Sequence, residues 1–386
     1  MAFRPEEPAA CYDAALVRIL LDYRPALRQR TGVGQYVHEL AAAMRPMLRP
    51  GESLVLFSSS WKDRLPPDTV PGAEVVDARV PVRVLNLAWH RLEWPPVERL
   101  AGRVDVAHSM HPLLVPARPQ VVKLVTVHDL DFLDHPGRTR AEIRRDYPAL
   151  AAVHARRADL VVVNSEHTAR QVRTRLGVSA ERVVLCRPGA PPASNGARSD
   201  RSGPILFVGT IEPRKNLPTL FAAYEQLVAR NAGVPPLVLA GASVEQSAEI
   251  LDALRARTAL AGRVEYRGYV TDTERQSLYA AASMLVLPSF HEGFGLTAVE
   301  AMQAGLPVIA STAGALPEVV GLAGITVDPA DAAGFADAME RLLDNPAEHQ
   351  RRAEAGRQQA RLFSWDASAA TLLEAYRGAF ARRAAR

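Results

Sequence analysis

The chain has 386 residues, of which 48% are hydrophobic and 23% are charged, with a formal net charge of +4. These proportions are typical of a soluble globular protein. Because single hydrophobic cores stop growing near about 250–300 residues, we expect two domains. The sequence contains no run of about 18 apolar residues that could span a membrane, and its N-terminal segment does not read as a secretory signal.

The distribution of charge and of cysteine indicates which partners and which cellular compartment to expect. The basic excess lies in the N-terminal half, but its arginines are scattered without interleaved aromatic residues, so we expect no nucleic-acid partner. A mildly basic half could approach an anionic membrane or a phosphorylated lipid; an Arg-rich composition without electrostatic purpose explains it equally well. Cys11 and Cys186 are far apart and lack metal-binding spacing, which favours a reducing compartment. We expect a cytoplasmic protein, with peripheral contact at the inner membrane face as an option.

Short apolar runs alternate with longer helical patterns along the chain. Alternation of this kind predicts the α/β class, with two Rossmann-like, doubly wound parallel sheets. In such sheets, ligands bind beyond the carboxyl ends of the strands. The predicted strands are 17–21, 53–57, 104–107, 120–127, 160–163 and 182–185 in the first half, and 205–208, 237–240, 264–266, 284–287 and 308–310 in the second.

A stretch rich in Pro, Gly, Ser and Ala divides the chain near its middle. We predict a first domain over residues 1–190, a linker over 191–203, a second domain over 204–364 and a separate helix over 365–386. Two such domains facing each other across a linker would form a cleft between them.

Two segments of the first half follow predicted strands. Gly32 and Gly34 lie where a helix should begin, so backbone amides there can approach an anion such as a diphosphate; a plain tight turn is the alternative. The run 120–127 ends just before His128, which we expect to face the cleft; a histidine that hydrogen-bonds a backbone group is the alternative.

His108 and His111 are spaced as two ligands of a metal ion could be. The sequence shows no third metal ligand near them, and we expect no metal.

The tryptophans of the first half raise a separate question about membranes. Trp89 and Trp94 could anchor the chain at a membrane interface, but we expect this helix to pack its aromatic residues into the first domain.

In the second half, Gly209 ends a strand and is followed by Arg214 and Lys215, just before a helix predicted to begin near Leu217. Two adjacent cations beside a helix start are unfavourable against the helix dipole unless an anion lies there. A nucleoside diphosphate would be such an anion, and Arg and Lys could bind separate phosphoryl oxygens. A solvated charged loop is the alternative.

The strongest pattern runs from Pro288 to Val320. Glu292 and Glu300 lie eight positions apart, and Gly293, Phe294, Gly295 and Leu296 form a turn that opens a helix. Free amides at that helix start favour a phosphate, and the two carboxylates can bind hydroxyls along the same cleft. The combination suits a nucleotide-sugar; a solvated helix face is the alternative reading of the two glutamates.

This segment resembles the Glu-x7-Glu signature of retaining GT-B glycosyltransferases of family 4, over about thirty contiguous residues. The resemblance implies two facing Rossmann-like domains, with acceptor binding on the N-terminal one and a last helix that crosses back to it. It implies that His128 contacts the transferred sugar, that Arg214 and Lys215 bind the diphosphate, and that Glu292 and Glu300 bind sugar and ribose hydroxyls. By the same resemblance Gly241 lies beside the nucleotide, and the backbone near Tyr269 and Val270 lies against the base.

We therefore expect a metal-independent, retaining hexosyltransferase that uses no cofactor, because the nucleotide-sugar is its substrate. The opening of the chain and the region around His128 look most like bacterial mannosyltransferases, which favours GDP-mannose; UDP-sugars stay open. The acceptor would be a glycan, a lipid-linked molecule or a small molecule. The alternatives are a nucleotide-sugar epimerase-like enzyme of the same fold and a catalytically dead nucleotide-sugar-binding protein.

Overall fold

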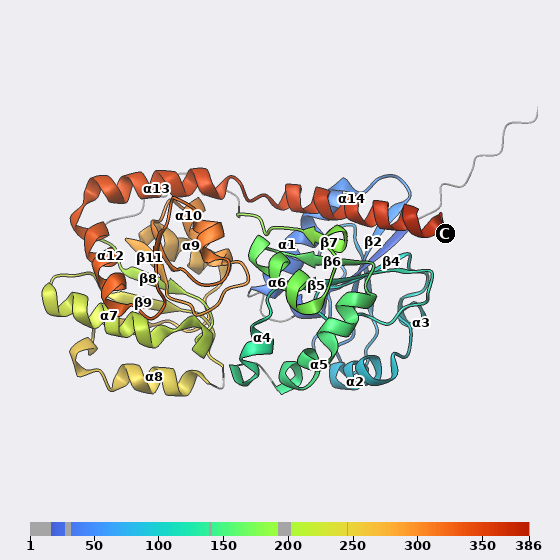
Figure 1. Ribbon diagram of the computed structural model, residues 1–386, viewed down its shortest axis with the longest axis horizontal. Helices are drawn as coiled ribbons and strands as arrows, with labels where there is room; N and C mark the ends of the chain where they lie inside the picture. The colour runs from blue at the N-terminus through green and yellow to red at the C-terminus, as the bar shows by residue number, and fades with distance from the viewer. Residues whose placement is uncertain (1–16, 28–31, 139–140, 192–201, 245, 386) are drawn as a thin grey trace, which may run out of the picture.

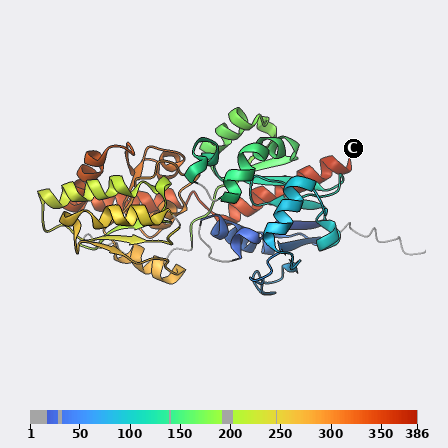
Figure 2. The ribbon, with the colours of Figure 1, turned by 90° about the horizontal axis from the view of Figure 1, so that it is seen from below.

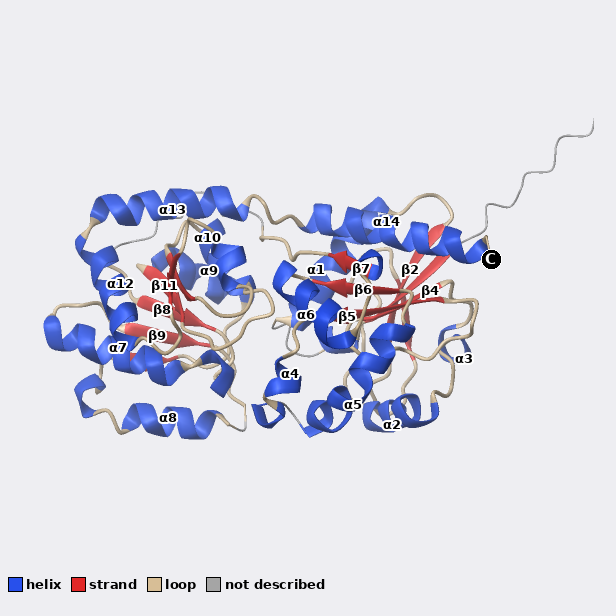
Figure 3. Cartoon of the chain, viewed as in Figure 1, coloured by secondary structure: helices blue, strands red, loops and turns tan. Residues whose placement is uncertain are grey.

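A computed structural model describes residues 17–27, 32–138, 141–191, 202–244 and 246–385. These residues form two α/β units that lie side by side along the long axis of the molecule (Figures 1 and 2). Each unit contains one sheet whose strands all pair in parallel, with helices on both faces (Figure 3). Cys11 and most of the predicted linker lie outside the described residues.

The first unit contains a seven-stranded sheet in the order β3-β2-β1-β4-β5-β6-β7. Its central strands are buried, as runs rich in Leu and Val require when helices cover both faces. The elements are β1 (Val17–Asp22), α1 (Val33–Met44), β2 (Glu52–Ser58), β3 (Glu74–Asp77), α2 (Val82–Leu92), α3 (Glu98–Ala101), β4 (Val106–Ser109), β5 (Val122–Val127), α4 (Asp131–Asp134), α5 (Ala141–Arg157), β6 (Leu160–Val163), α6 (Glu166–Leu176) and β7 (Val183–Leu185).

The second unit contains a six-stranded sheet in the order β10-β9-β8-β11-β12-β13. Its core is continuous from the sheet to the flanking helices. The elements are β8 (Ile205–Val208), α7 (Leu217–Arg230), β9 (Leu237–Ala240), α8 (Ser247–Arg255), β10 (Val264–Tyr266), α9 (Asp272–Ala281), β11 (Met284–Leu287), α10 (Leu296–Gln303), β12 (Val308–Ser311), α11 (Leu316–Val320), β13 (Ile325–Val327), α12 (Ala332–Asp344) and α13 (Pro346–Ala360).

The predicted fold class is confirmed, and each predicted strand is present with its ends within two residues of the prediction. Two strands were not predicted, β3 and β13, and both lie at the edge of a sheet. Their side chains are only partly buried, and β13 has three residues. A short, half-exposed edge strand lacks the continuous apolar run that marks a buried strand in the sequence.

The last helix, α14 (Trp365–Ala384), packs against α1 of the first unit. Leu372 and Tyr376 are buried in the core of that unit, and the Tyr376 hydroxyl lies 2.6 Å from Nδ1 of His108. Arg377 forms an ion pair of 2.8 Å with Glu52. Helices α13 and α14 (red in Figure 1) therefore run along one side of both units, and the chain returns to the unit where it began.

The two units touch where the carboxyl ends of their strands meet. The Glu318 carboxylate on α11 accepts hydrogen bonds from the backbone amides of Glu166 and His167 at the start of α6, at 2.9 and 3.1 Å. A carboxylate is favourable there because the free amides and the dipole of α6 present positive charge. This contact fixes the edge of the second unit against the first, next to the residues described below.

Candidate active site

Glu292 forms the centre of the candidate site, in the loop between β11 and α10. Its side chain is buried, yet both carboxylate oxygens are bound by cations from the loop that follows β8. Lys215 Nζ lies 2.6 Å from Oε1, and an Arg214 terminal nitrogen lies 3.2 Å from Oε2. Ser289 donates a further hydrogen bond of 2.8 Å to Oε1. The structure thus brings the adjacent Arg214 and Lys215 together with Glu292, which lies 77 positions beyond Lys215.

The charges of this cluster are strongly coupled. Burial alone would raise the pKa of Glu292, but Lys215 and Arg214 outweigh it and lower the pKa to about 2. The pKa of Arg214 is raised, because Glu292, Glu212 and Asp129 together outweigh its burial. The cations therefore already have an anionic partner within the protein. Adjacent cations before α7 therefore do not by themselves require an external anion, as the sequence had suggested, because Glu292 supplies negative charge to both.

At the N-terminus of α10, which follows Glu292, the hydrogen-bond donors open to a ligand are backbone amides and not side chains. Gly295 precedes α10 with φ of 103°, and no side chain caps this helix. The Phe294 ring is buried and packs edge-on against Phe363, at a centroid distance of 5.4 Å. Leu296 is half-buried against the core. An anion at this position would thus meet amides at the positive end of the α10 dipole.

Gly293 is required by a close approach between the two units. A Cβ atom at this position would lie 2.1 Å from the carbonyl oxygen of His128. Any other residue would push the first unit away from the Glu292 loop. Gly293 thus sets the distance between the site residues of the two units.

Glu300 lies on α10 and is 1% exposed. Its Oε2 accepts a hydrogen bond of 2.9 Å from the Tyr279 hydroxyl, and its Oε1 accepts bonds of 3.0 Å from Gln35 and 3.2 Å from Arg275. Gln35 belongs to α1 of the first unit, so this carboxylate bridges the two units. Burial raises the pKa of Glu300, and Arg275, Tyr279 and Gln35 offset part of that rise.

His128 lies directly after β5 in the first unit, and its carbonyl oxygen lies against Gly293 of the second unit. Its Nε2 lies 3.2 Å from the carbonyl oxygen of Met110, and its ring meets Tyr36 edge-on at 5.2 Å. Because a carbonyl can only accept, Nε2 carries the proton in the neutral ring, and Nδ1 can accept a hydrogen bond from a hydroxyl. Burial lowers the pKa of His128 to about 4, so the ring is neutral at pH 7.

The predicted glycine loop lies at the start of α1. Gly32 precedes the helix with φ of 49°, and no side chain caps it. Gly34 lies in the first turn and is buried. Arg30 and Thr31, the start of this segment, lie outside the described residues. The one turn of α1 that contains Gly34 also carries Gln35, the residue that reaches Glu300.

Two more predicted residues lie at strand ends of the second unit. Gly241 is a close-approach glycine, but the group it approaches is protein: its Cβ atom would lie 1.9 Å from the Gly209 carbonyl oxygen. The structure thus gives Gly241 a packing reason of its own, whereas a Cβ atom at Gly209 would lie 3.2 Å from the Phe207 ring. Tyr269 is 42% exposed and Val270 is buried, in the loop between β10 and α9.

Several functional candidates were not predicted from the sequence. Gln35, Arg275 and Tyr279 surround Glu300, but they come from α1 and α9, far from the Glu292–Glu300 segment. Glu318 lies within the Pro288–Val320 segment, but its contact with α6 was not predicted. No local signal marks such partners, because each is defined only by the packing of separate helices.

Other sequence candidates have structural partners. His108 is buried between Tyr376 and Thr126, and burial lowers its pKa to about 3. His111 lies 3.2 Å from the Asp22 carboxylate. Trp89 is buried, and its indole donates to the Pro95 carbonyl at 3.0 Å, which excludes it as a membrane anchor, whereas Trp94 is 54% exposed.

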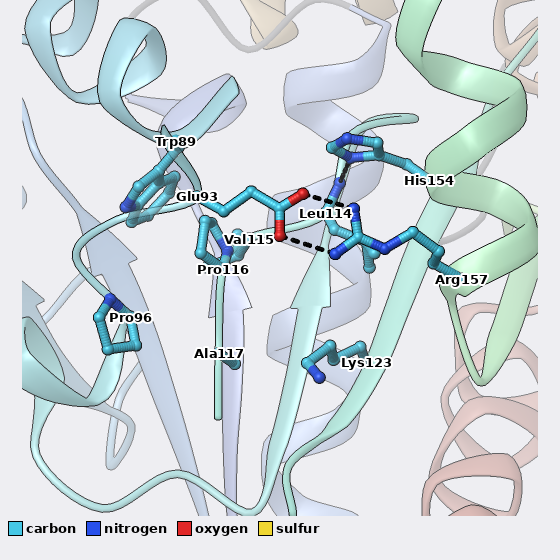
Figure 4. Close-up of a pocket in the computed structure, with 10 residues that line it drawn as sticks. All are labelled: Trp89, Glu93, Pro96, Leu114, Val115, Pro116, Ala117, Lys123, His154 and Arg157. Carbon is cyan, nitrogen blue, oxygen red and sulfur yellow. Dashed lines mark hydrogen bonds and ion pairs between the residues drawn. The ribbon is translucent and has the colours of Figure 1, made fainter. Parts of the chain in front are cut away.

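A separate cavity of about 80 Å³ lies in the first unit (Figure 4). Its lining comes from α2, the β4–β5 segment and α5, and its ten lining residues include none of the predicted site residues. Glu93 and Arg157 point toward one another across it and are ion-paired, and Nδ1 of His154 accepts a bond of 2.8 Å from the Leu114 amide. The polar groups of this cavity thus largely satisfy one another.

Comparison with known families divides the chain as the fold does. Residues 30–193 match Glycosyltransferase Family 4, and residues 203–345 match Glycosyl transferases group 1. The glycogen synthase of Mycobacterium tuberculosis is 30% identical over 89% of this chain and 90% of its own length. The O-antigen chain mannosyltransferase B of Escherichia coli is 34% identical over 57% of this chain and 58% of its own length.

Solved structures agree with the fold. Sucrose-phosphate synthase of Thermosynechococcus elongatus superposes with a TM-score of 0.78 over 95% of this chain and all of that chain, at 23% identity. Anabaena HepE, solved in complex with UDP and glucose, superposes with a TM-score of 0.70 over 93% of this chain and 99% of its own, at 18% identity. Both have the same two-unit architecture.

The lowered pKa of His128 predicts a pH-dependent stability. Its ordinary pKa is 6.5 and its folded value is about 4, so the unfolded chain binds a proton that the folded chain does not. The stabilisation is complete above pH 6.5 and is lost as the pH falls toward 4. Between pH 7 and pH 5 this group alone should remove up to about 2 kcal/mol from the free energy of unfolding.

Urea denaturation at both pH values should show that His128→Gln loses less stability on acidification than wild type. Equal losses in the two proteins would contradict the assignment.

Proposed function

This chain belongs to the group 1, family 4 glycosyltransferases, and we propose that it moves a hexose from a nucleoside diphosphate donor to an acceptor hydroxyl with retention of configuration. The observation that carries this proposal is the arrangement around Glu292. A carboxylate, two cations and an open helix start lie together in the second unit, and the backbone of His128 in the first unit approaches the same loop at Gly293.

The departing diphosphate is the group that this arrangement suits best. A Lys ammonium has three donors, and Glu292 occupies one of those of Lys215, so two can meet phosphoryl oxygens. Arg214 and the amides beyond Gly295 add donors from the same side. Fixed positive charge aimed at a leaving group lowers the barrier because the developing charge is stabilised without reorganisation. We propose that this charge takes the place of a divalent metal, and that the enzyme works without a metal and without a cofactor.

The remaining residues would hold the donor in place. Glu292 would bind hydroxyls of the donor sugar, because it stays ionised despite burial. Nδ1 of His128 would accept a hydrogen bond from the sugar on the other side, and Glu300 would bind the ribose hydroxyls. The glycines at the start of α1, Gly32 and Gly34, would admit the diphosphate from the first unit. Holding donor and acceptor in this geometry contributes to catalysis by orientation.

The donor is proposed to be GDP-mannose, and the acceptor a glycan, a lipid-linked molecule or a small molecule. The similarity to an O-antigen mannosyltransferase supports mannose. UDP-glucose is the alternative donor to be assayed, because the chain is similar to a glycogen synthase and to HepE, which was solved in complex with UDP. An epimerase-like enzyme would alter the sugar without transferring it, and a binding protein would release no nucleotide.

Incubation with a panel of nucleotide-sugars tests the proposal directly. We expect release of GDP from GDP-mannose when an acceptor is added, and undiminished release in excess EDTA because Arg214 and Lys215 supply the positive charge. NMR of the product should show the anomeric configuration of the donor. Conversion of the donor sugar without an acceptor would favour the epimerase, binding without turnover would favour the binding protein, and loss of activity in EDTA would contradict metal independence.

Lys215→Ala should lower kcat by about 10²–10³, the usual effect of removing one electrostatic contact with a developing charge. The variant also leaves Glu292 with a single cation, so thermal unfolding must be measured beside turnover. Lys62→Ala, an exposed lysine of the first unit, is the matched control and should keep full turnover. Near-normal turnover in the folded Lys215 variant would remove Lys215 from the proposed mechanism.

We further propose that the first unit rests on the anionic inner face of a membrane through α2. No helix within the described parts of the chain has the length and apolarity needed to cross a bilayer. Helix α2 and the turn after it, however, expose Val84, Leu87, Leu92 and Trp94, with exposed fractions of 54 to 72%. The arginines around this face, Arg79, Arg83, Arg91 and Arg99, are exposed, and Arg99 lies over the Trp94 ring at 5.6 Å. An exposed helix face that combines apolar residues with arginines is typical of interfacial helices.

Vesicle co-sedimentation tests this surface. Wild type should bind phosphatidylglycerol vesicles more than phosphatidylcholine vesicles, and Leu87→Asp should reduce the bound fraction several-fold by placing a charge in the apolar face. Leu362→Asp, at a residue of the second unit that is 71% exposed, is the control and should bind like wild type. Equal binding by the two variants would show that α2 does not form the contact.

A further inference from the structure

Arg275 is buried beside Glu300 at the boundary between the two units. It lies on α9 and its residue is 9% exposed, an unusual position for a guanidinium. Its Nε lies 3.0 Å from Oε2 of Glu300, and a terminal nitrogen lies 3.2 Å from Oε1, so the guanidinium spans both oxygens of the carboxylate. Its other terminal nitrogen reaches Asp272 at 2.9 Å, and that carboxylate is exposed.

The partners of Glu300 differ in kind. From α9 come Arg275 and Tyr279, and from α1 comes Gln35. Of the three, Arg275 is the one that is charged at neutral pH. Tyr279 is buried and its pKa is raised well above its ordinary value, so it remains a neutral donor. The charge of the Glu300 carboxylate, which is 1% exposed, is thus compensated mainly by one guanidinium.

The contact with Gln35 is of another type, because it crosses from one unit to the other. A carboxylate can accept about four hydrogen bonds, and here Arg275 and Tyr279 hold it from its own unit. Gln35 is therefore the partner that a ligand hydroxyl could replace without disturbing the second unit. A cavity of about 270 Å³ lies directly beside these groups, lined in part by Gln35, Arg275, Asp272 and Gln276.

We propose that Arg275 is a positioning residue for the nucleotide, holding Glu300 ionised and oriented so that its free edge meets the ribose hydroxyls. The proposal rests on the proposed role of Glu300 in binding ribose. Arg275 itself need not touch the ligand. Replacing it by an uncharged residue would leave a buried carboxyl without compensation, and such a group takes up a proton instead of remaining charged. Protonated Glu300 would then lose the charge-assisted hydrogen bonds to the ribose.

The test is the affinity for GDP as a function of pH, measured by calorimetric titration from pH 6 to pH 8.5. For Arg275→Leu we expect weaker binding than wild type, and a ratio of the two Kd values that grows as the pH falls. The growth should approach about tenfold for each pH unit below the pKa of the variant's Glu300, because the ionised fraction falls by that factor. Titration of GDP itself cancels in the ratio.

Three controls separate positioning from a general structural effect. Asp272→Asn removes the exposed partner of Arg275 and should bind GDP like wild type at every pH. Arg275→Lys keeps the charge, so its Kd ratio should stay flat with pH even if its affinity is lower. With 2′,3′-dideoxy-GDP, which lacks the ribose hydroxyls, the ratio for Arg275→Leu should also be flat. If the leucine variant fails to fold, Arg275→Gln, which can still donate hydrogen bonds, carries the same measurement.

The proposal would be overturned if the ratio of the Kd values for GDP, Arg275→Leu over wild type, stayed constant across this pH range. Glu300→Ala distinguishes that failure from a failure of the proposed function. If Glu300→Ala weakens GDP but hardly affects dideoxy-GDP, then Glu300 meets the ribose, and a flat profile for Arg275→Leu refutes only the positioning role. If Glu300→Ala weakens both ligands equally, the ribose role of Glu300 is wrong and the positioning role is refuted with it.

Discussion

The structure of the site depends on one buried carboxylate, Glu292, and on the cations that neutralise it. An ionised glutamate at 7% exposure is unfavourable unless it is paired and hydrogen-bonded, and Lys215 and Arg214 meet that requirement at 2.6 and 3.2 Å. The pairing fixes the loop after β8 to the loop after β11. Close packing also holds the loop after β11 in place. A Cβ atom at Gly314 would lie 2.4 Å from the Glu292 carbonyl oxygen, and a Cβ atom at Gly293 would meet the first unit.

The two glutamates of the same segment have opposite electrostatic environments. Two nearby cations hold the pKa of Glu292 low, whereas burial raises the pKa of Glu300 and one guanidinium only partly offsets it. A group with a low pKa keeps its charge under all ordinary conditions, which suits the proposed role of Glu292 in binding the donor sugar. A group whose charge depends on a single neighbour is sensitive to that neighbour, and this makes Arg275 important although it lies outside the motif.

The boundary between the units is polar and specific. Gln35 reaches Glu300, Glu318 binds the start of α6, and Thr168 donates to the Gly293 carbonyl oxygen at 3.5 Å. Each of these contacts joins a strand end or helix start of one unit to the other. The chain segment from α13 to α14 also connects the two units covalently, since α14 packs on the first unit. Residues from both sheets therefore contribute to one site, as binding at the carboxyl ends of parallel strands requires.

The sequence by itself determined the fold class, the buried strands and the Glu292–Glu300 segment, because continuous apolar runs and a glycine-containing helix start are local signals. It could not reveal the edge strands β3 and β13, whose half-exposed residues carry no such pattern. Only the tertiary structure decided which charges neutralise which: that Glu292 is the anion for Lys215, and that Arg275 and Gln35 meet Glu300. These pairs join residues 25 to 265 positions apart, and their energies depend on distance and burial in the folded chain rather than on spacing along it.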